Sequence, residues 1–189
     1  MSQQELLSNV IRALEGAGVP YMLTGSLVSS AQGEPRATHD LDVVVALTPP
    51  DVPRRFAALD VLGGYVDELA MQKALHETGM FNYIDGKTGL KVDFWTLTAE
   101  PFDVSRFSRR RSEPLLGLAV SVSAPEDTIL AKLRWARLAG GSEKQFTDAL
   151  RVFEVQGNSL DRVYLDRWAA ELEVADAWRR IQEEGSDLH

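Results

Sequence analysis

Apolar and polar residues follow two patterns along the chain, one with the spacing of helices and one with that of strands. The first helix is predicted from four apolar residues, and it ends near Gly16. These four are Leu6, Val10, Ile11 and Leu14. Short runs rich in β-branched and aromatic residues predict strands over residues 19–24, 39–47, 80–84, 90–97 and 118–122. The Asp85-Gly86 pair favours a hairpin turn between the third and fourth of these runs.

Helical patterns occupy the segments between the strands and the whole chain after Ser123. The predicted helices cover about residues 27–32, 52–62, 68–77, 125–138, 143–155, 160–172 and 175–182. Pro49-Pro50 ends the second strand, and Asp51 can cap the helix that follows. Residues 123–126 and 142–145 match the capping-box pattern. We therefore predict a mixed α/β core over residues 1–122 and a helical region over 123–185 that packs on it.

Composition restricts the class of protein. The chain has 189 residues, of which 44% are hydrophobic and 25% charged, so a globular, soluble protein is expected. The absence of cysteine excludes disulfides and thiolate metal sites and favours a cytoplasmic location. We expect no membrane association, because the N-terminal residues lack a signal-peptide pattern and no apolar stretch reaches membrane-spanning length.

The net charge of −8 argues against broad, nonspecific binding to nucleic acid, which requires a positive field. One basic cluster stands out against this acidic background. It consists of Arg106, Arg109, Arg110 and Arg111. This cluster could be a solvated turn, as charge blocks usually are, or a docking patch for an RNA backbone or a triphosphate.

The most informative motif is Asp40-Leu41-Asp42, which opens the apolar run of the second predicted strand. Side chains alternate between the two faces of a strand, so Asp40 and Asp42 point the same way. Two adjacent carboxylates repel each other, and a divalent cation between them relieves that repulsion. These two residues are therefore candidate ligands of Mg²⁺.

A third acid, Asp93, is flanked by apolar residues on another predicted strand. It could complete the metal site or accept a proton from an attacking hydroxyl. The alternative is an edge-strand acid that discourages sheet pairing. Trp95, two residues further on, shares the face of Asp93 and could stack against a base or serve only in packing.

Gly25-Ser26 follows the first predicted strand and opens a short helix. Such a junction presents backbone N–H groups and a hydroxyl at a helix N-terminus, where an anion is favoured. Arg36 and Thr38 lie in the loop before the acids and could touch phosphate. Together these features predict a Mg²⁺-dependent site for phosphoryl or nucleotidyl transfer that uses an NTP.

The order of these parts resembles the nucleotidyltransferase superfamily, the DNA polymerase β-like fold. The family pattern is an apolar strand, Gly-Gly or Gly-Ser, a spacer of about nine to thirteen residues, and Asp-apolar-Asp-apolar. Here thirteen residues separate Gly25-Ser26 from Asp40-Leu41-Asp42, and Asp93 matches the third acid. The resemblance covers about residues 19–97. It implies an α+β fold in which a small mixed sheet is flanked by helices and followed by a helical bundle, and two-metal transfer of NMP from an NTP.

Within that superfamily the chain looks most like small bacterial proteins grouped with abortive-infection toxins and minimal nucleotidyltransferases. In toxins of that type a C-terminal helix carries a lysine and a nearby acid at the site. Lys132 matches such a catalytic lysine, and Lys144 with Asp148 lies in the next helix. Either lysine could instead be a solvated residue on an amphipathic helix.

These features predict an enzyme that moves NMP from an NTP to a hydroxyl of a tRNA end, a protein side chain or a small molecule. By resemblance, its setting is a bacterial toxin–antitoxin or defence module. The alternative is a non-catalytic protein of the same fold that binds a toxin or antitoxin partner. The intact acids Asp40, Asp42 and Asp93 favour the enzyme, since a degenerate protein would more readily have lost one of them.

Overall fold

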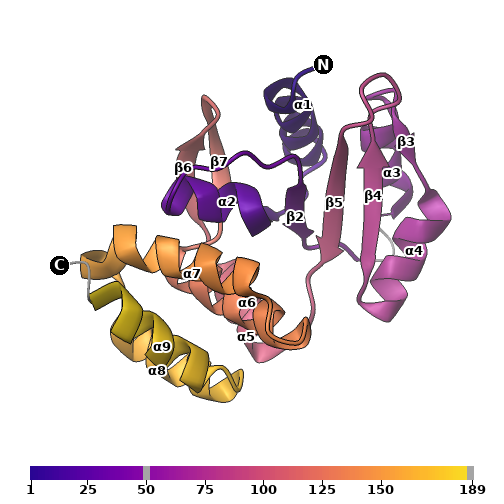
Figure 1. Cartoon of the computed structure of the whole chain (residues 1–189). Coiled ribbons are helices and arrows are strands. Elements are labelled where there is room, and N and C mark those ends of the chain that lie inside the picture. Colours follow the sequence, from indigo (N-terminus) through magenta and orange to yellow (C-terminus); the bar gives the residue numbers. More distant parts are fainter. Residues whose placement is uncertain (49–51, 187–189) are drawn as a thin grey trace. The chain divides into compact units, whose positions relative to one another are not determined.

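The computed structural model describes residues 1–48 and 52–186 (Figure 1). Its strands are β1 (Tyr21–Thr24), β2 (Leu41–Val45), β3 (Tyr65–Val66), β4 (Met80–Ile84), β5 (Lys91–Thr96), β6 (Arg111–Leu115) and β7 (Leu118–Val122). Its helices are α1 (Gln3–Gly16), α2 (Gly25–Gln32), α3 (Val52–Asp60), α4 (Glu68–Glu77), α5 (Pro101–Ser108), α6 (Pro125–Leu138), α7 (Glu143–Gln156), α8 (Arg162–Glu171) and α9 (Ala175–Ser186), with a 3₁₀ turn, η2, at Gly157–Ser159. The proline pair at 49–50 and the predicted cap at Asp51 lie outside the described residues.

The strands of the described residues form one mixed sheet in the order β3-β4-β5-β2-β1-β7-β6. The central strand β2 pairs antiparallel with β1 and parallel with β5. The β4–β5 hairpin is antiparallel, as the Asp-Gly turn predicts. Because β2 and β5 are parallel neighbours, residues far apart in the sequence stand side by side near the middle of the sheet.

The two faces of this sheet differ in polarity. One face is apolar, and its Phe81 and Phe94 rings stack with centroids 5.0 Å apart. Residues of α1, α3 and α4 gather against this face around Val45 and Phe81. On the other face Met22 and Val44 form a small cluster with Phe107 of α5. Beyond this cluster the second face is polar, and it carries Asp42 of β2 and Asp93 of β5.

The α+β fold predicted from the sequence is confirmed, because a mixed sheet and flanking helices are present. Four short elements were not predicted, namely β3, α5, β6 and the 3₁₀ turn η2. The prediction of a capping box at Ser123 is wrong. Helix α6 begins after Ala124 without a side-chain cap, and the Ser123 hydroxyl donates to the Ala124 carbonyl instead. Ser142 does precede α7, but its side chain makes no capping hydrogen bond.

The described chain divides into two compact units. Unit 1 comprises residues 1–24 and 39–122, and unit 2 comprises residues 25–38 and 123–189. Unit 1 thus contains the whole sheet, whereas unit 2 contains α2 together with the C-terminal helices. Of the helices in residues 1–48 and 52–186, none is both long and apolar enough to cross a membrane.

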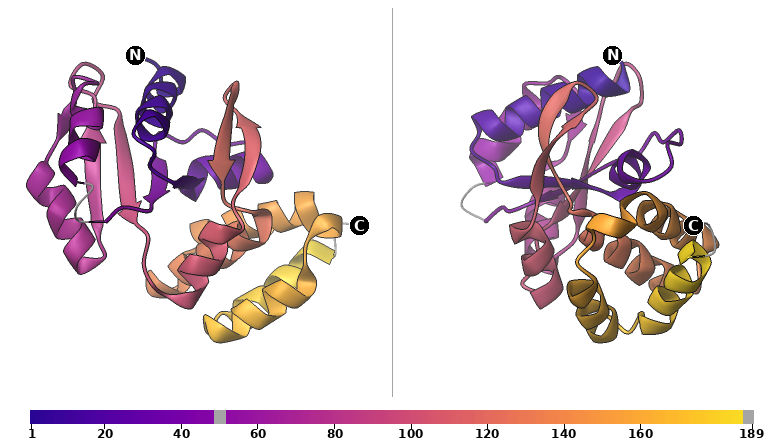
Figure 2. Two further views of the ribbon diagram at one scale, coloured as in Figure 1. Left: turned by 180° about the vertical axis from the view of Figure 1, so that it is seen from behind. Right: turned by 90° about the vertical axis from the view of Figure 1, so that its left-hand side faces the viewer.

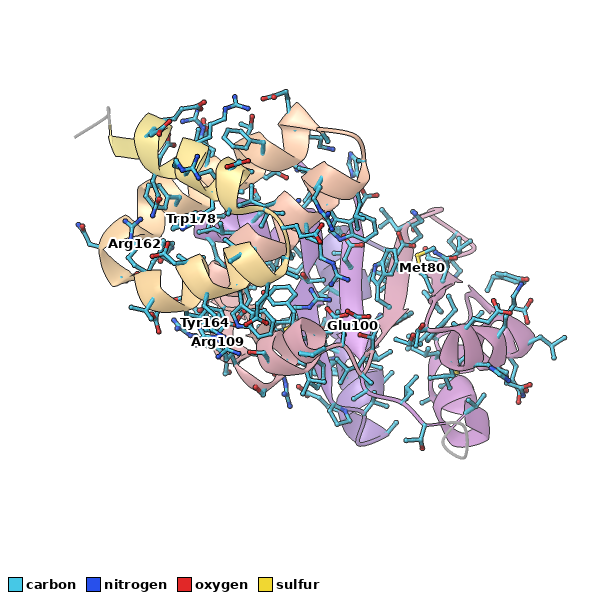
Figure 3. All side chains as sticks on the ribbon, turned by 90° about the horizontal axis from the view of Figure 1, so that it is seen from below. Met80, Glu100, Arg109, Arg162, Tyr164 and Trp178 are labelled. Carbon is cyan, nitrogen blue, oxygen red and sulfur yellow. The ribbon has the colours of Figure 1, made fainter. Side chains whose placement is uncertain are left out.

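Unit 2 is a helical assembly in which α6 and α7 pack along each other and α2 contacts both. Helices α8 and α9 lie side by side (Figure 2). Figure 3 shows Arg162 of α8 close to Trp178 of α9, and its guanidinium lies 5.8 Å from that ring centroid and 4.4 Å from the centroid of Phe153. Tyr164, also on α8, donates a hydrogen bond of 2.6 Å to Asp127 of α6. These contacts fix the helices that carry several of the predicted site residues.

Gly33 allows α2 to approach α7 closely, and its replacement should destabilise unit 2. A Cβ atom at this position would stand 2.8 Å from backbone atoms of Arg151 and Val152, which cannot move aside as a flexible side chain would. Gly33→Ala is expected to lower the free energy of unfolding by about 2 kcal/mol, measured by urea denaturation. The matched control is Gly16→Ala, where a Cβ would meet nothing within 4 Å. An equally stable Gly33→Ala protein would contradict the close approach.

Candidate functional site

Asp42 and Asp93 stand side by side on the polar face of the sheet. In the parallel pairing of β2 and β5, Asp42 is the register partner of Asp93. The row continues in both directions, because Thr24 of β1 pairs with Asp42 and Asn82 of β4 pairs with Asp93. Register partners on neighbouring strands point to the same face, about 4.8 Å apart along the row. Asp42 and Asp93 are therefore neighbours on one face of the sheet in unit 1.

The Asp93 carboxylate is held by two neighbours on the same face. The Lys91 ammonium donates to both of its oxygens, at 2.9 and 3.3 Å. The Asn82 amide also donates to one oxygen, through a short hydrogen bond. Asp93 is 9% exposed, so it is not the exposed edge-strand acid that the sequence left as an alternative. It lies on an interior strand with partners on both sides.

Asp42 accepts a hydrogen bond from Trp95 of the neighbouring strand β5. The indole N–H of Trp95 donates to an Asp42 oxygen at 3.2 Å. Trp95 is the register partner of Val44, two residues further along β2 than Asp42. The Trp95 ring packs against the Met22–Val44–Phe107 cluster. An aromatic ring anchored in this way places a hydrogen-bond donor rigidly beside a carboxylate. Asp40, which precedes β2 by one residue, is exposed.

Lys91 is under the influence of all three acids. Its pKa is raised, first by the hydrogen bond with Asp93 and further by the charges of Asp93, Asp40 and Asp42, although partial burial opposes the rise. The lysine is therefore fully protonated at neutral pH. Its ammonium supplies positive charge to a group of carboxylates that would otherwise repel one another.

These residues suit a hard divalent cation in their chemistry. Carboxylate oxygens are the donors that Mg²⁺ prefers, and the Lys91 ammonium shows that a cation is stabilised at this face. Within residues 1–48 and 52–186, however, no three His, Cys, Asp or Glu side chains are arranged as a ready set of metal ligands. The oxygens of Asp93 are held by Lys91 and Asn82 instead. A metal would need the side chains of Asp40, Asp42 and Asp93 to reorient.

A second polar cluster lies within unit 2 and joins α2 and its following loop to α6 and α7. Asp148 of α7 accepts two hydrogen bonds from the Arg36 guanidinium, at 2.9 and 2.8 Å, and one of 2.7 Å from the Lys132 ammonium. The Ser26 hydroxyl accepts from Arg36 at 3.0 Å and from Lys132 at 3.4 Å. Two cations and one carboxylate thus surround a single hydroxyl.

Burial makes this cluster electrostatically strong. The side chains of Lys132 and Asp148 are 6% and 8% exposed, and that of Arg36 is 33% exposed. Burial by itself would raise the pKa of Asp148, but the hydrogen bonds and charges of Arg36 and Lys132 outweigh it and lower that pKa. Arg36, Lys132 and Asp148 together carry a formal charge of +1, and two cations beside a hydroxyl favour an anion.

The other predicted residues of unit 2 are more exposed. Gly25 has φ = 72°, a left-handed conformation that glycine adopts without strain, and it opens α2 directly after β1. Thr38 is half-buried at the end of the loop that carries Arg36. Lys144 is exposed in the first turn of α7, four residues before Asp148. Lys132, in contrast, is not the solvated lysine that an amphipathic helix would allow.

The basic cluster at 106–111 spans the end of α5 and the start of β6 in unit 1. Arg106 donates to Asp103 at 2.8 Å, and only 16% of its side chain is exposed. Arg110 donates to the Phe107 carbonyl at 2.6 Å, and its guanidinium lies 4.3 Å from the Phe107 ring centroid. Arg106 and Arg110 therefore have local structural partners.

Sequence reasoning overlooked Lys91 and Asn82, the two residues that hold Asp93. Lys91 shares the strand face of Asp93 by simple alternation, so period-two reasoning could have found it. Asn82 belongs to the other arm of the hairpin and faces Asp93 only through the register of β4 with β5. That register depends on the length of the turn, which single-residue patterns do not reveal.

Comparison with known proteins locates the fold but not a sequence family. No family model and no curated protein matches this sequence. Among solved structures, the antibiotic-resistance factor ANT(2'')-Ia in solution is similar with a TM-score of 0.61 and 16% identity, over 99% of this chain and 98% of that one. Its complex with adenylyl-2''-tobramycin has the same TM-score and identity over 92% of this chain and 98% of that one.

An antigenic nucleotidyltransferase-like protein from Paracoccidioides brasiliensis is similar as well. It has a TM-score of 0.67 and 15% identity, over 98% of this chain and 89% of that one. At such low identity the likeness establishes the fold, which is the nucleotidyltransferase-like fold expected from the Gly-Ser and Asp-Leu-Asp motifs. The narrower resemblance to abortive-infection toxins finds no support among these structures and stays a prediction.

Proposed function

We propose that this protein is a Mg²⁺-dependent nucleotidyltransferase that moves NMP from an NTP to a hydroxyl acceptor. The observation that carries the proposal is the register pairing of Asp42 with Asp93 on two central parallel strands. The chain has the fold of nucleotidyltransferase-like proteins. Two carboxylates fixed next to each other on one sheet face, with a third at the strand entrance, form a suitable donor set for Mg²⁺.

The residues of unit 1 have distinct roles in this proposal. Asp40, Asp42 and Asp93 would hold Mg²⁺, which supplies Lewis-acid stabilisation of phosphate charge. The acceptor oxygen forms a bond to the α-phosphorus, the bond from that phosphorus to the bridging oxygen breaks, and pyrophosphate leaves. The acceptor proton passes to the Asp93 carboxylate, whose position is fixed by Asn82.

The sequence resemblance alone assigns the polar cluster of unit 2 to the triphosphate. Lys132 and Arg36 would donate to phosphate oxygens, and the Ser26 hydroxyl would donate its own proton there, because both of its contacts to these cations are made as an acceptor. The backbone at Gly25, together with Thr38 and Lys144, would add further contacts. Asp148 keeps Lys132 and Arg36 in place, since it accepts hydrogen bonds from both.

The acceptor is a hydroxyl of a small molecule, a tRNA end or a protein side chain. The similar structure of ANT(2'')-Ia contains adenylyl-2''-tobramycin, the kind of product in which an adenylyl group is bound to a small molecule. The net charge of −8 of this chain also disfavours a long nucleic acid as acceptor. Both observations support testing hydroxyl-rich small molecules first.

The proposal is tested by incubating the protein with each α-labelled NTP, Mg²⁺ and one of three acceptors. The acceptors are an aminoglycoside panel, bulk tRNA and lysate protein, and EDTA serves as the blank. We expect Mg²⁺-dependent transfer of label to one acceptor class and release of pyrophosphate. Absence of transfer in every combination, together with absence of Mg²⁺ and NTP binding by calorimetry, would contradict the enzyme and favour a non-catalytic protein of this fold.

Trp95→Phe should reduce transfer about tenfold or more, because it removes the N–H that orients Asp42 and keeps the aromatic packing. The reduction should appear as a higher Mg²⁺ concentration for half-maximal rate. Trp135→Phe, at a half-exposed position of α6, is the control and should leave both rate and Mg²⁺ requirement unchanged. Wild-type Mg²⁺ dependence in Trp95→Phe would show that the indole N–H does not position Asp42.

A toxin–antitoxin or defence setting, with a toxin or antitoxin partner, stays a prediction that derives from the sequence resemblance alone. Expression of the wild-type protein and of Asp42→Asn in a bacterial host tests it. Growth arrest by the wild type alone is expected for a catalytic toxin. Equal growth of both cultures would contradict that setting and leave the transfer reaction to be judged by the labelling assay.

A further inference from the structure

The Lys91 ammonium stands where a cation is needed to balance the acids of unit 1. It lies 2.9 Å from one oxygen of Asp93 and 3.3 Å from the other, so it occupies lone pairs of both oxygens that a metal ion would otherwise use. We propose that Lys91 is a resident counter-ion of the acid group, and that Mg²⁺ binds there only by displacing the ammonium from Asp93. This inference depends on the proposed function, because it concerns the same Mg²⁺ site.

The position of Lys91 on β5 explains its reach. Lys91 and Asp93 are two residues apart on one strand and share a face. β2 and β5 are parallel, and Leu41 pairs with Val92. Asp40 and Lys91, each one residue earlier, therefore lie opposite each other. Lys91 therefore stands next to Asp93 along its own strand and next to Asp40 across the sheet. No other lysine or arginine belongs to β2 or β5.

The ammonium and Mg²⁺ compete for the same oxygens. Mg²⁺ requires oxygen ligands at 2.0–2.1 Å in octahedral geometry. An oxygen that already accepts a hydrogen bond from an ammonium is poorly available as such a ligand. The two cations would also repel each other across a few ångströms. Displacement is feasible because 47% of the Lys91 side chain is exposed and its four-carbon stem can turn toward water.

Displacement also accounts for the arrangement of the acids. No three acidic or histidine side chains of the described residues are poised as metal ligands, and Asp93 is committed to Lys91 and Asn82. A site that holds its own cation avoids a group of uncompensated carboxylates when no metal is present. The cost is weaker binding of Mg²⁺, since the ion pair must first be broken.

Calorimetry with MgCl₂ on the full chain without nucleotide tests the inference, with three variants. Lys91→Met removes the charge and keeps the length, and we expect it to bind Mg²⁺ about tenfold more tightly than wild type. In Lys91→Arg, the guanidinium can hold the Asp93 carboxylate through bidentate hydrogen bonds, so this variant should bind Mg²⁺ no more tightly than wild type. Lys87→Met removes one charge from the exposed turn of the same hairpin and controls for net charge.

Thermal unfolding in EDTA is the second measurement. In EDTA, Lys91→Met should have a lower melting temperature than wild type. Addition of Mg²⁺ should raise the melting temperature of Lys91→Met more than it raises that of Lys87→Met. If Lys91→Met does not fold in EDTA, the inference is supported by its refolding on addition of Mg²⁺, together with an Mg²⁺ affinity of Lys91→Arg no higher than that of wild type. Lys91→Met binding no tighter than wild type, or Lys91→Arg binding tighter, would overturn the inference.

The outcomes separate this inference from the proposed function. If wild type binds Mg²⁺ and Lys91→Met binds it equally, only the counter-ion role of Lys91 fails. If neither protein binds Mg²⁺, with or without NTP, the metal site of the proposed function fails and the inference fails with it. Loss of the binding in Asp93→Asn identifies the acid group as the location of the ion.

Discussion

Asp42→Asn should lower kcat/KM for NMP transfer about a thousandfold or more, which corresponds to roughly 4 kcal/mol of lost transition-state stabilisation. Asp42 is the central acid, because it is the register partner of Asp93 and also accepts the hydrogen bond from Trp95. The substitution keeps the shape of the side chain and removes its charge. Asp40→Ala should have a similar effect if Asp40 turns toward the same ion, as its place at the entrance of β2 allows.

The measurement is transfer of label from the preferred NTP across a Mg²⁺ titration, with circular dichroism as the test of folding. Asp176→Asn is the matched control, because the Asp176 side chain is 94% exposed and forms a surface ion pair with Arg179, three residues further along α9. It should retain wild-type activity. Full activity in both Asp40→Ala and Asp42→Asn would eliminate the metal mechanism.

Asp148→Asn should destabilise the protein by about 3 kcal/mol, the largest stability effect that we expect. Asp148 accepts hydrogen bonds from both Lys132 and Arg36 in the buried cluster of unit 2. Its neutralisation removes a negative charge 2.7 Å from the Lys132 ammonium, whose side chain is only 6% exposed. Urea denaturation at neutral pH measures the loss.

A double-mutant cycle provides the control for this prediction. Lys132→Met removes the buried cation, so the Asp148→Asn/Lys132→Met protein should be more stable than the sum of the two single effects implies. Additive losses would show that Lys132 and Asp148 do not stabilise each other. Transfer activity should fall in each single variant, because both disturb the group assigned to the triphosphate.

The stability of wild type should depend on acid pH through the same residue. The pKa of Asp148 is lower in the folded protein than in the unfolded chain, so the folded state binds its proton less readily. The stabilisation is therefore fully present above the ordinary pKa of an aspartate, about 3.9, and is lost as the pH falls through the lower folded value. Asp148→Asn should show a shallower loss of stability in that acid range.

Much of the fold could be predicted from the sequence, because its central strands are short, apolar and clearly bounded. The runs that became β2, β4 and β5 are of this kind. The edge strand β3 has two residues and β6 contains Pro114, so neither shows an apolar alternation that could be recognised. Helix α5 follows β5 closely and has no side-chain cap, and its start signal, Pro101 in the first turn, was overlooked.

The candidate site was predicted in part. Asp42 and Asp93 could be assigned to one site, because each lies in an apolar predicted strand and both match acids of the family pattern. The ion pairs of Asp148 with Arg36 and Lys132 could not be derived, because 112 and 16 residues separate these partners along the chain. Only tertiary packing of α2, α6 and α7 brings them together. Trp95 shows the same limit, since its N–H donates to Asp42 on the neighbouring strand β2, 53 residues earlier in the chain.

The division of the chain has a consequence for any shortened form of this protein. Residues 25–38 leave unit 1 after β1, contribute α2 to unit 2 and return before β2. A truncation after Val122 would therefore remove α6 and α7 and expose the apolar side of α2 that packs on them. The sheet could not be produced as a soluble fragment by a stop codon at that point. A fragment of the sheet alone would need residues 25–38 replaced by a short polar linker.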